Sequence, residues 1–390
     1  MKNIEQYHAF LNRQVEPEVL KVYRNFCLQK LETAPEMEFK YGLNIVIRPT
    51  EFDFNIIPAD SPKLERNITK NKTKMFTSET ISKMNKEEKN IFEKFLDKNF
   101  LSEYDKMDYV NQALTNDIFY VIIPEECEEK IYVETNIQSN IFTNIFIYAK
   151  KNSKSKIFIK KSSDKNVYVS ETIRIIAEEN ARVECITIQD IDKSSINIQK
   201  RKSIIKKDAE VRWIDMCLGS RYTKTSVISE LQEEGASTNN VVLYLADGEQ
   251  KMDIYTVSIH QAPHTNSDII TKGVLNNEAK TLSRGLIKIE KNAFGSNGYE
   301  KQDSLLLSEF AQSNAIPNLK INNHDVKCSH GSTVGQLDQD KVFYCMSRGL
   351  NKMQAQQKIV EGYFIPVLDN IHDKIIKEKM HEIIAQKLHA

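Results

Sequence analysis

Short apolar and β-branched segments dominate the middle of the chain, from about residue 118 to residue 335. They are rich in Ile, Val, Tyr and Thr and show little helical periodicity, which is typical of β-strands. Only the Asp247-Gly248 pair gives a clear hairpin signal. The pattern therefore fits either a β-sandwich or a β-helix of stacked coils, and no strict repeat decides between them. We expect strands at residues 119–123, 130–134, 145–149, 156–160, 167–176, 181–188, 195–198, 211–216, 226–231, 241–246, 254–260, 267–275, 286–289, 304–307 and 319–321.

Helical periodicity marks the N-terminal third of the chain. Apolar side chains recur at helical spacing in residues 18–31 and again in residues 79–100, so we expect helices there. Between them, the proline-rich residues 35–62 predict a loop with one short strand at residues 43–47. The polar, Lys- and Asn-rich residues 63–74 indicate an exposed linker.

Capping signals divide the last part of the chain into helices. Asp338 is a candidate N-cap ahead of the apolar residues 342–346, and Gly349 is a C-cap signal. Asn351 is placed to cap a second helix, which we expect to end at Gly362.

A long amphipathic helix is expected to open at Pro366. Its apolar stripe must pack on the body of the protein or on a partner helix. The stripe comprises Val367, Leu368, Ile371, Ile375, Ile376, Met380, Ile383, Ile384 and Leu388.

Composition and charge exclude several classes of protein. The chain has 390 residues, 40% hydrophobic and 28% charged, which suits a globular protein of two or three structural units. It has no apolar run long enough to span a membrane, and because residues 1–10 carry no apolar stretch we expect no secretory signal. The 54 basic and 54 acidic residues balance, which argues against nucleic acid as a partner. The six cysteines form no CxxC pair, so we expect reduced thiols and a cytoplasmic location.

The strongest cluster of metal-binding residue types is His324, Cys328, His330 and Cys345. Thiolate and imidazole ligands suit zinc, copper(I) or iron–sulfur chemistry. If Cys328 and His330 lie on a strand, they project from the same face. Two structural interpretations stay open: Cys328 and Cys345 as buried thiols, and His330 as a hydrogen-bonded turn residue.

The other candidate residues give weaker evidence for a metal or catalytic site. His260 and His264 flank Pro263, which disfavours a helical metal site, so packing or hydrogen bonding is the expected role. Trp213 lies in a strand-like run and is expected in the core. The chain contains no P-loop and neither a GxGxxG nor a GxSxG motif.

The C-terminal part of the chain resembles a known family. The run IPNLKINNHDVKCSHGSTVGQLDQDKVFYCMSRGLNKMQAQQKIVEGYF, residues 316–364, is similar to the SufB/SufD family of iron–sulfur cluster assembly proteins. PHTNSDIITKGVL at 263–275, TLSRGLIKI at 281–289 and SLLLSEFAQSNAIPNL at 304–319 add to the resemblance. Together they cover about the last 130 residues, whereas the N-terminal third carries no recognisable motif.

The resemblance implies a mainly β fold. It consists of an N-terminal helical region (1–117), a central right-handed parallel β-helix (118–335) and a C-terminal helical region (336–390). This division agrees with the change of period along the chain. It also selects the β-helix over the sandwich.

The implied function is that of a scaffold and not of an enzyme. A SufD-like chain pairs with a SufB-type subunit and binds a SufC-type ATPase, and the complex builds nascent iron–sulfur clusters. A cysteine desulfurase system supplies the sulfur, and a flavin can be involved through the complex. The alternative within the family is a sole SufB/SufD-type subunit that forms a homodimer. A distant alternative is a β-helix protein acting on carbohydrates.

The resemblance also implies site residues. His330, in the run KCSHG, takes the position of a SufD histidine implicated in holding the nascent cluster at the subunit interface. Cys345 takes the position of a SufB cysteine implicated in cluster assembly, and Cys328 is a further cluster-binding candidate. A thiolate needs a nearby metal or cation, for which Lys327, Lys341, Arg348 and His330 itself are candidates by proximity in the sequence.

Two departures from SufB favour a SufD-like chain. Where SufB has an acidic residue after the position of Gly362, this sequence places Lys374 beside Asp373. Where SufB has a sulfur-accepting cysteine in the β-helix, this sequence has Ser226 or Ser229. Cys217 is close in sequence but lies on a different run.

Overall fold

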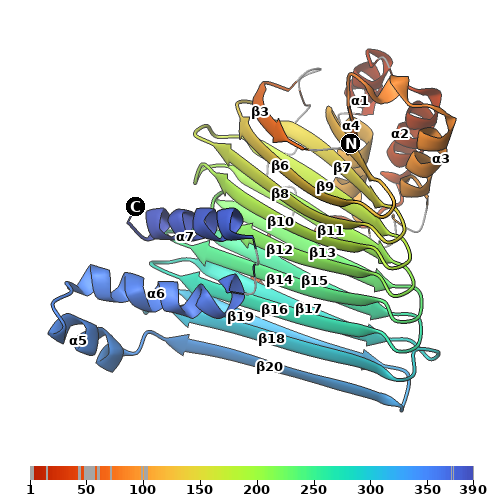
Figure 1. The fold of residues 1–390 in the computed structure, drawn as a ribbon. Coiled ribbons are helices and arrows are strands. Elements are labelled where there is room, and N and C mark those ends of the chain that lie inside the picture. The colour runs from red at the N-terminus through yellow and green to blue at the C-terminus, as the bar shows by residue number, and fades with distance from the viewer. Residues whose placement is uncertain are drawn as a thin grey trace.

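The computed structural model describes residues 4–14, 16–42, 45–47, 58, 62–70, 73–97, 100, 104–369, 371 and 373–389. Its main body is a parallel β-helix built from two long sheets that face each other across a packed lumen (Figure 1). Helices stand at the N-terminal and C-terminal ends of the chain. This confirms the expected β-helix with helical ends and removes the sandwich that the residue pattern alone left open.

The chain alternates between the two sheets. The first sheet contains β6 (Glu128–Ile137), β8 (Lys154–Ser163), β10 (Arg182–Ile191), β12 (Glu210–Cys217), β14 (Ser237–Ala246), β16 (Asn266–Leu275), β18 (Ser296–Leu306) and β20 (Val326–Gln336). The second sheet contains β5 (Asp117–Ile123), β7 (Ile141–Ala149), β9 (Tyr168–Ala177), β11 (Ile196–Ile205), β13 (Tyr222–Leu231), β15 (Lys251–His260), β17 (Lys280–Ile289) and β19 (Gln312–Ile321). Every strand expected between residues 118 and 335 falls on one of the strands β5 to β19, whereas β20 was not among those expected.

Coil length varies along the β-helix. Arg212 lies beside Glu184, 28 residues earlier, whereas Asn297 lies beside Asn266, 31 residues earlier. Because the turns absorb these differences, strands stay in register while the sequence shows no strict repeat.

Antiparallel strands close the first coil. Strand β3 (Leu64–Thr69) pairs with β6, and β4 (Lys74–Thr77) pairs with β5. The prediction of an exposed linker at 63–74 is therefore wrong for these strands. An edge strand pairs through its backbone while most of its side chains face water, so a polar sequence can form it. The short hairpin of β1 (Phe39–Gly42) and β2 (Ile45–Ile47) confirms part of the strand expected at 43–47, whose first two residues lie outside the described residues.

The N-terminal helices pack on the outer face of the second sheet. They are α1 (Ile4–Asn12), α2 (Glu18–Lys30), α3 (Lys86–Phe95) and α4 (Lys106–Leu114), and α2 confirms the helix expected at 18–31. The helix expected at 79–100 is confirmed over α3 but not along its whole length. A 3₁₀ turn (η2, Ile81–Lys83) precedes α3, which begins at a capping box formed by Asn85 and Glu88. Phe92 and Phe95 of α3 contact Phe146 of β7.

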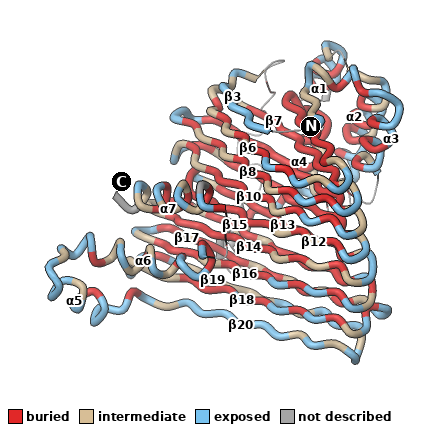
Figure 2. The backbone as a smooth tube through the Cα atoms, viewed as in Figure 1, coloured by how far each residue is buried: buried red, intermediate tan, exposed pale blue. Residues whose placement is uncertain are grey.

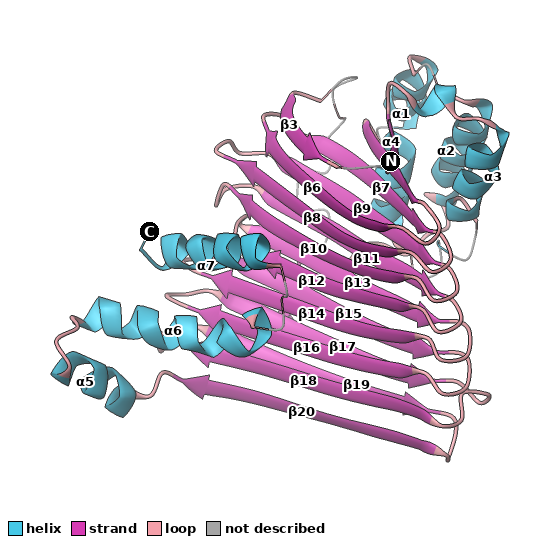
Figure 3. Cartoon of the chain, in the orientation of Figure 1, coloured by secondary structure: helices cyan, strands magenta, loops and turns pink. Residues whose placement is uncertain are grey.

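The C-terminal helices are α5 (Gln339–Ser347), α6 (Lys352–Leu368) and α7 (Lys374–His389), with α6 and α7 on the outer face of the first sheet (Figure 3). Asp338 and Asn351 are N-caps as expected. The expected end at Gly362 and start at Pro366 are wrong, because α6 runs through both. Packing of Phe364 and its apolar neighbours on the sheet outweighs the weak helix propensity of glycine, about 1 kcal/mol.

The two ends of the β-helix differ. The first coil is covered by β3, β4 and the N-terminal helices, whereas Figure 2 shows β20 exposed along its length. Within the described part of the chain, no strand pairs with the outer edges of β19 and β20. No described helix has the length and apolar character needed to cross a bilayer.

Candidate functional site

The KCSHG run lies on β20, the last strand of the β-helix. Its register with β18 is continuous and places Cys328 beside Gly298 and His330 beside Glu300. Alternation puts Cys328 and His330 on the same face of the strand, which is the face directed into the lumen. His330 is exposed because no further coil covers it. His330 thus occupies a strand and not a turn.

The Cys328 thiol occupies space left by a glycine. A Cβ atom at Gly298 would lie 3.1 Å from the Cys328 sulfur. Around it pack Ile287 and Leu319 of the second sheet. Burial and then the negative charge of Glu300 raise the pKa of the Cys328 thiol. In the isolated subunit the sulfur is therefore held as a thiol, and a metal ion would be needed to displace its proton.

Of the cations expected near the thiols, Lys327 faces away from Cys328, and Lys341 and Arg348 have other partners. Lys327 is exposed on the opposite face of β20, since neighbouring residues of a strand alternate. On α5, Lys341 pairs with Asp338 at 3.7 Å, and the Arg348 guanidinium donates to the Tyr344 hydroxyl at 3.3 Å.

Cys345 lies apart from the other two candidates. It is half-buried on α5 and packs beside Val342 and Ala355, against α6. His330 is six residues from the end of β20 at Gln336, a span of about 20 Å. Within the described residues, no three His, Cys, Asp or Glu side chains gather as a ready-made metal site. One chain alone therefore does not bring Cys345 and His330 together.

Glu300 is a site residue that sequence reasoning missed. Its side chain is fully buried in the lumen, one strand away from His330. Gln302 donates to its Oε1 at 2.5 Å, while Oε2 has no hydrogen-bond partner in the part of the chain that the structure describes. Burial raises the pKa of Glu300 to about 7, against the opposing effects of hydrogen bonds from Gln302 and the Asn318 backbone. The only sequence signal is a carboxylate at an inward position of GYEKQDS, which requires the strand register to recognise.

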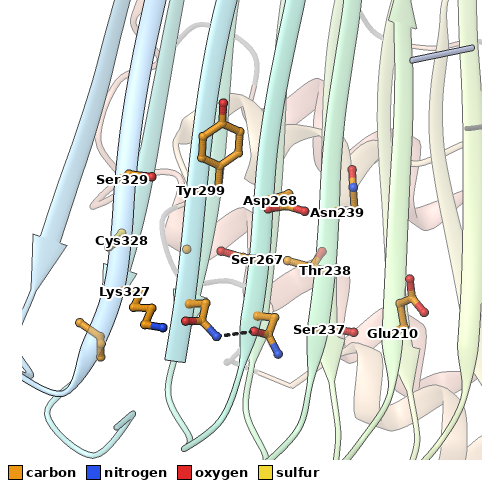
Figure 4. Close-up of a pocket in the computed structure, with 14 residues that line it drawn as sticks. Glu210, Ser237, Thr238, Asn239, Ser267, Asp268, Tyr299, Lys327, Cys328 and Ser329 are labelled. Atoms are coloured by element: carbon orange, nitrogen blue, oxygen red, sulfur yellow. Dashed lines mark hydrogen bonds between the residues drawn. The ribbon is translucent and has the colours of Figure 1, made fainter. Parts of the chain in front are cut away.

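A polar groove of about 700 Å³ crosses the starts of β12, β14, β16, β18 and β20 (Figure 4). Asn239, Asp268 and Tyr299 line its floor, and Lys327 and Ser329 line its β20 border. Burial raises the pKa of Asp268. The groove offers hydrogen-bonding groups and an exposed aromatic ring, and it borders Cys328.

The remaining candidates have structural roles. Cys217 points into the lumen, where burial raises the pKa of its thiol far above the usual range. Ser229 is bonded to Ser203 and Asn240 inside the lumen. Trp213 is fully buried in the same core, as expected.

Asp373 and His260 also have structural roles. Asp373 forms an ion pair with Lys130 at 2.8 Å and accepts from the backbone of Ile376. The His260 ring bonds to the hydroxyls of Thr265 and Ser267, which confirms the expected hydrogen-bonding role.

Apolar side chains project from the outer surface of α5 and the start of α6. Phe343 is 72% exposed, and Tyr344, Met346 and Met353 are exposed beside it in sequence. Singly exposed apolar residues are ordinary, but this group on one short helix and its neighbour indicates a contact surface.

Comparison with known proteins agrees with this arrangement. The model of the family described as "SUF system FeS cluster assembly, SufBD core domain" matches residues 132–363. An iron-sulfur cluster assembly SufBD family protein of Mycobacterium bovis is 31% identical over 198 residues, 51% of this chain and 23% of that protein. One of Staphylococcus epidermidis is 28% identical over 197 residues, 50% of this chain and 42% of that protein.

The matches thus span less than half the length of these relatives. The family match, by contrast, extends from within β6 to β20 with Cys328 and His330, α5 with Cys345, and most of α6. Because it covers more than half of the chain, this protein belongs to the SufB/SufD family of iron–sulfur cluster assembly proteins.

Proposed function

We propose that this chain is a SufD-like scaffold subunit, which pairs with a SufB-type subunit and a SufC-type ATPase to build nascent iron–sulfur clusters. The observation that carries the proposal is the open end of the β-helix. There, an exposed strand displays Cys328 and His330 beside unpaired sheet edges, while Cys345 lies out of reach on the same chain. A site that uses both His330 and Cys345 therefore needs a second subunit.

The outer edge of β20 suits strand addition. The strand is 11 residues long, and Lys327 is its only Lys, Arg, Asp or Glu residue. Soluble proteins usually protect such an edge with charge, proline or a covering segment. An edge left unprotected at this length fits pairing with the corresponding strand of a SufBD-type partner.

We call this pairing of β20 with the partner's strand the joint. A cluster held at the joint would be shared between the two subunits. His330 lies near the middle of the edge strand, so a partner strand added there would lie next to it. Imidazole in place of thiolate, and ligands divided between two chains, both favour release of the cargo when the joint opens. The cluster is thus cargo of the scaffold.

In this proposal, other proteins supply the ATP hydrolysis and the sulfur that cluster assembly needs. It lacks a P-loop, so ATP hydrolysis belongs to a SufC-type ATPase, for which the exposed apolar side chains of α5 offer a docking surface. Sulfur would come from a cysteine desulfurase system, and any flavin would be carried by the complex. We assign no catalytic residue to this chain.

The alternative is a homodimer in which this chain is the sole SufB/SufD-type subunit. The observation in its favour is that His330 and Cys345 occur together in one sequence. Two copies joined through β20 would supply both residues twice. The chain purified without a SufB-type protein would then form a dimer through the same edge.

The test introduces charge at the proposed joint. Gly331→Lys combined with Thr333→Lys places two lysines on exposed positions of β20. A Cβ at Gly331 meets no atom within 4 Å, so the fold should tolerate the change. Asn67→Lys with Thr69→Lys is the matched control on β3, the edge strand at the opposite end.

We expect the β20 variant to lose its second SufBD-type subunit in size-exclusion chromatography with light scattering after co-expression with the SufB-type and SufC-type proteins. The β3 variant should keep it. Equal assembly of both variants would overturn the proposed joint, and a complex that never contains the ATPase would overturn the assignment to a SUF scaffold.

A further inference from the structure

The end of the lumen contains a buried carboxylate with one unused oxygen. Glu300 is 0% exposed, and no described residue hydrogen-bonds to its Oε2. Gln302, also buried on the same inward face, likewise has no partner for its Oε1 among the described residues. Buried polar groups are almost always satisfied, so each exception calls for water, an ion or a functional role.

The fold makes room for this carboxylate. A Cβ at Gly285 of β17 would lie 1.6 Å from Glu300 Oε1, so a larger residue there would displace the carboxylate from this position. The amide of Gln302 holds Oε1, and the backbone of Asn318 also hydrogen-bonds to the carboxylate. The side chain is thus fixed across the lumen, with Oε2 unbonded to any described residue.

Three different donor atoms share the same wall of the lumen. Glu300 and His330 are register partners on adjacent strands, about 4.8 Å apart, and their side chains lie on the same face. Cys328 is two residues before His330 on that face, about 7 Å along the strand. The three groups do not form a ready-made ligand set, but the exposed His330 ring can rotate about its side-chain bonds toward the other two.

The chemistry of this set suits ferrous iron. Iron accepts imidazole, carboxylate and thiolate ligands together. A divalent cation that binds the carboxylate and the sulfur takes the place of their protons, which pass to solvent.

We propose that Glu300 is an additional iron ligand, which with His330 and Cys328 holds a single Fe²⁺ at the end of the lumen before it enters the cluster. The proposal rests on the scaffold function proposed above, and it adds a residue from inside the β-helix to the site on β20. Binding forms Fe–S, Fe–N and Fe–O bonds, breaks the S–H bond of Cys328 and, where Glu300 is protonated, its O–H bond, releases these protons to solvent, and changes no oxidation state.

The test uses the full chain alone, free of metal and without oxygen, titrated with Co²⁺ as a spectroscopic probe and then with Fe²⁺. A thiolate-to-cobalt charge-transfer band reports the Cys328 bond. Glu300→Gln keeps the size and one acceptor oxygen but removes the charge. Glu309→Gln, on an exposed turn between β18 and β19, is the matched control.

We expect Glu300→Gln to weaken Co²⁺ and Fe²⁺ binding about tenfold or more, with His330→Ala similarly affected and Glu309→Gln unchanged. If the amide variant does not fold, Glu300→Asp retracts the carboxylate by one methylene and should also weaken binding. Wild-type affinity in a folded Glu300 variant, or no charge-transfer band in the wild type, would overturn the proposal.

These outcomes separate the inference from the function on which it rests. Metal binding by the isolated chain that depends on Glu300, in a protein that never joins a SUF complex, would refute the scaffold function alone. A complex that assembles clusters normally with Glu300→Gln and binds Fe²⁺ unchanged would refute the role of Glu300 alone.

Discussion

Acid should destabilise the β-helix through one buried histidine, His260. Its ring is fully buried, with Nδ1 and Nε2 each 2.8 Å from a hydroxyl, those of Thr265 and Ser267. Burial lowers the pKa of His260 from 6.5 to about 4. The folded protein therefore keeps a neutral ring at pH values where the unfolded chain binds a proton.

The size of the effect follows from linkage. The gap between the ordinary pKa of 6.5 and the folded pKa of about 4 corresponds to about 3 kcal/mol in full. Because the folded pKa is lowered, this stability is present above pH 6.5 and is lost as pH falls toward 4. At pH 5 the loss should be about 2 kcal/mol.

Urea unfolding followed by the fluorescence of Trp213, the only tryptophan, measures this loss. The free energy of unfolding is compared at pH 7.5 and pH 5 in the wild type and in His260→Gln. We expect the variant to lose about 2 kcal/mol less between these pH values, because glutamine hydrogen-bonds without titrating. His324→Gln, an exposed histidine, should behave as the wild type. An equal pH loss in His260→Gln and the wild type would refute the reasoning.

Two further predictions concern the lumen and the surface. Arg201 is fully buried and ion-paired with Asp215, so Arg201→Met should cost about 3–5 kcal/mol in urea unfolding. Lys151→Met is the control: it breaks an exposed ion pair and should lower the free energy of unfolding by less than about 1 kcal/mol. If the Arg201 and Lys151 variants lost the same free energy of unfolding, the buried ion pair would not stabilise the core as argued. Phe343→Ser should abolish co-purification of the SufC-type ATPase in a pull-down, whereas Val22→Ser, also exposed but on α2, should not. Retention of the ATPase by the Phe343 variant would exclude α5 as its docking surface.

The strands of the β-helix were largely predictable from composition, because buried parallel strands are apolar and β-branched whatever their partners. Strand β3 was not, since an edge strand such as Leu64–Thr69 is mostly exposed and reads as a polar linker. The predicted helix boundaries at Gly362 and Pro366 were wrong for a related reason. Glycine and proline both disfavour an isolated helix, but the packing of α6 on the first sheet outweighs their low helix propensity.

The candidate site was only partly predictable. The KCSHG run indicated Cys328 and His330 by residue type, and the strand register explains why they share a face. Nothing local in the sequence marks Glu300, because its position beside His330 depends on pairing with a strand 30 residues later in the chain. The separation of Cys345 from His330 likewise depends on how α5 leaves β20. Contacts between segments that are distant in the sequence therefore determine both the position of Glu300 and the separation of Cys345 from His330.

The most direct test of the account is the metal and sulfide content of the assembled complex. The chain is co-expressed with its SufB-type and SufC-type partners and purified without oxygen, and iron and acid-labile sulfide are measured per complex. The wild type is compared with His330→Ala and Cys345→Ser. The account predicts that both variants lose iron and sulfide while the complex elutes unchanged. Unchanged iron and sulfide in both variants would contradict it and would place the cluster ligands on another chain.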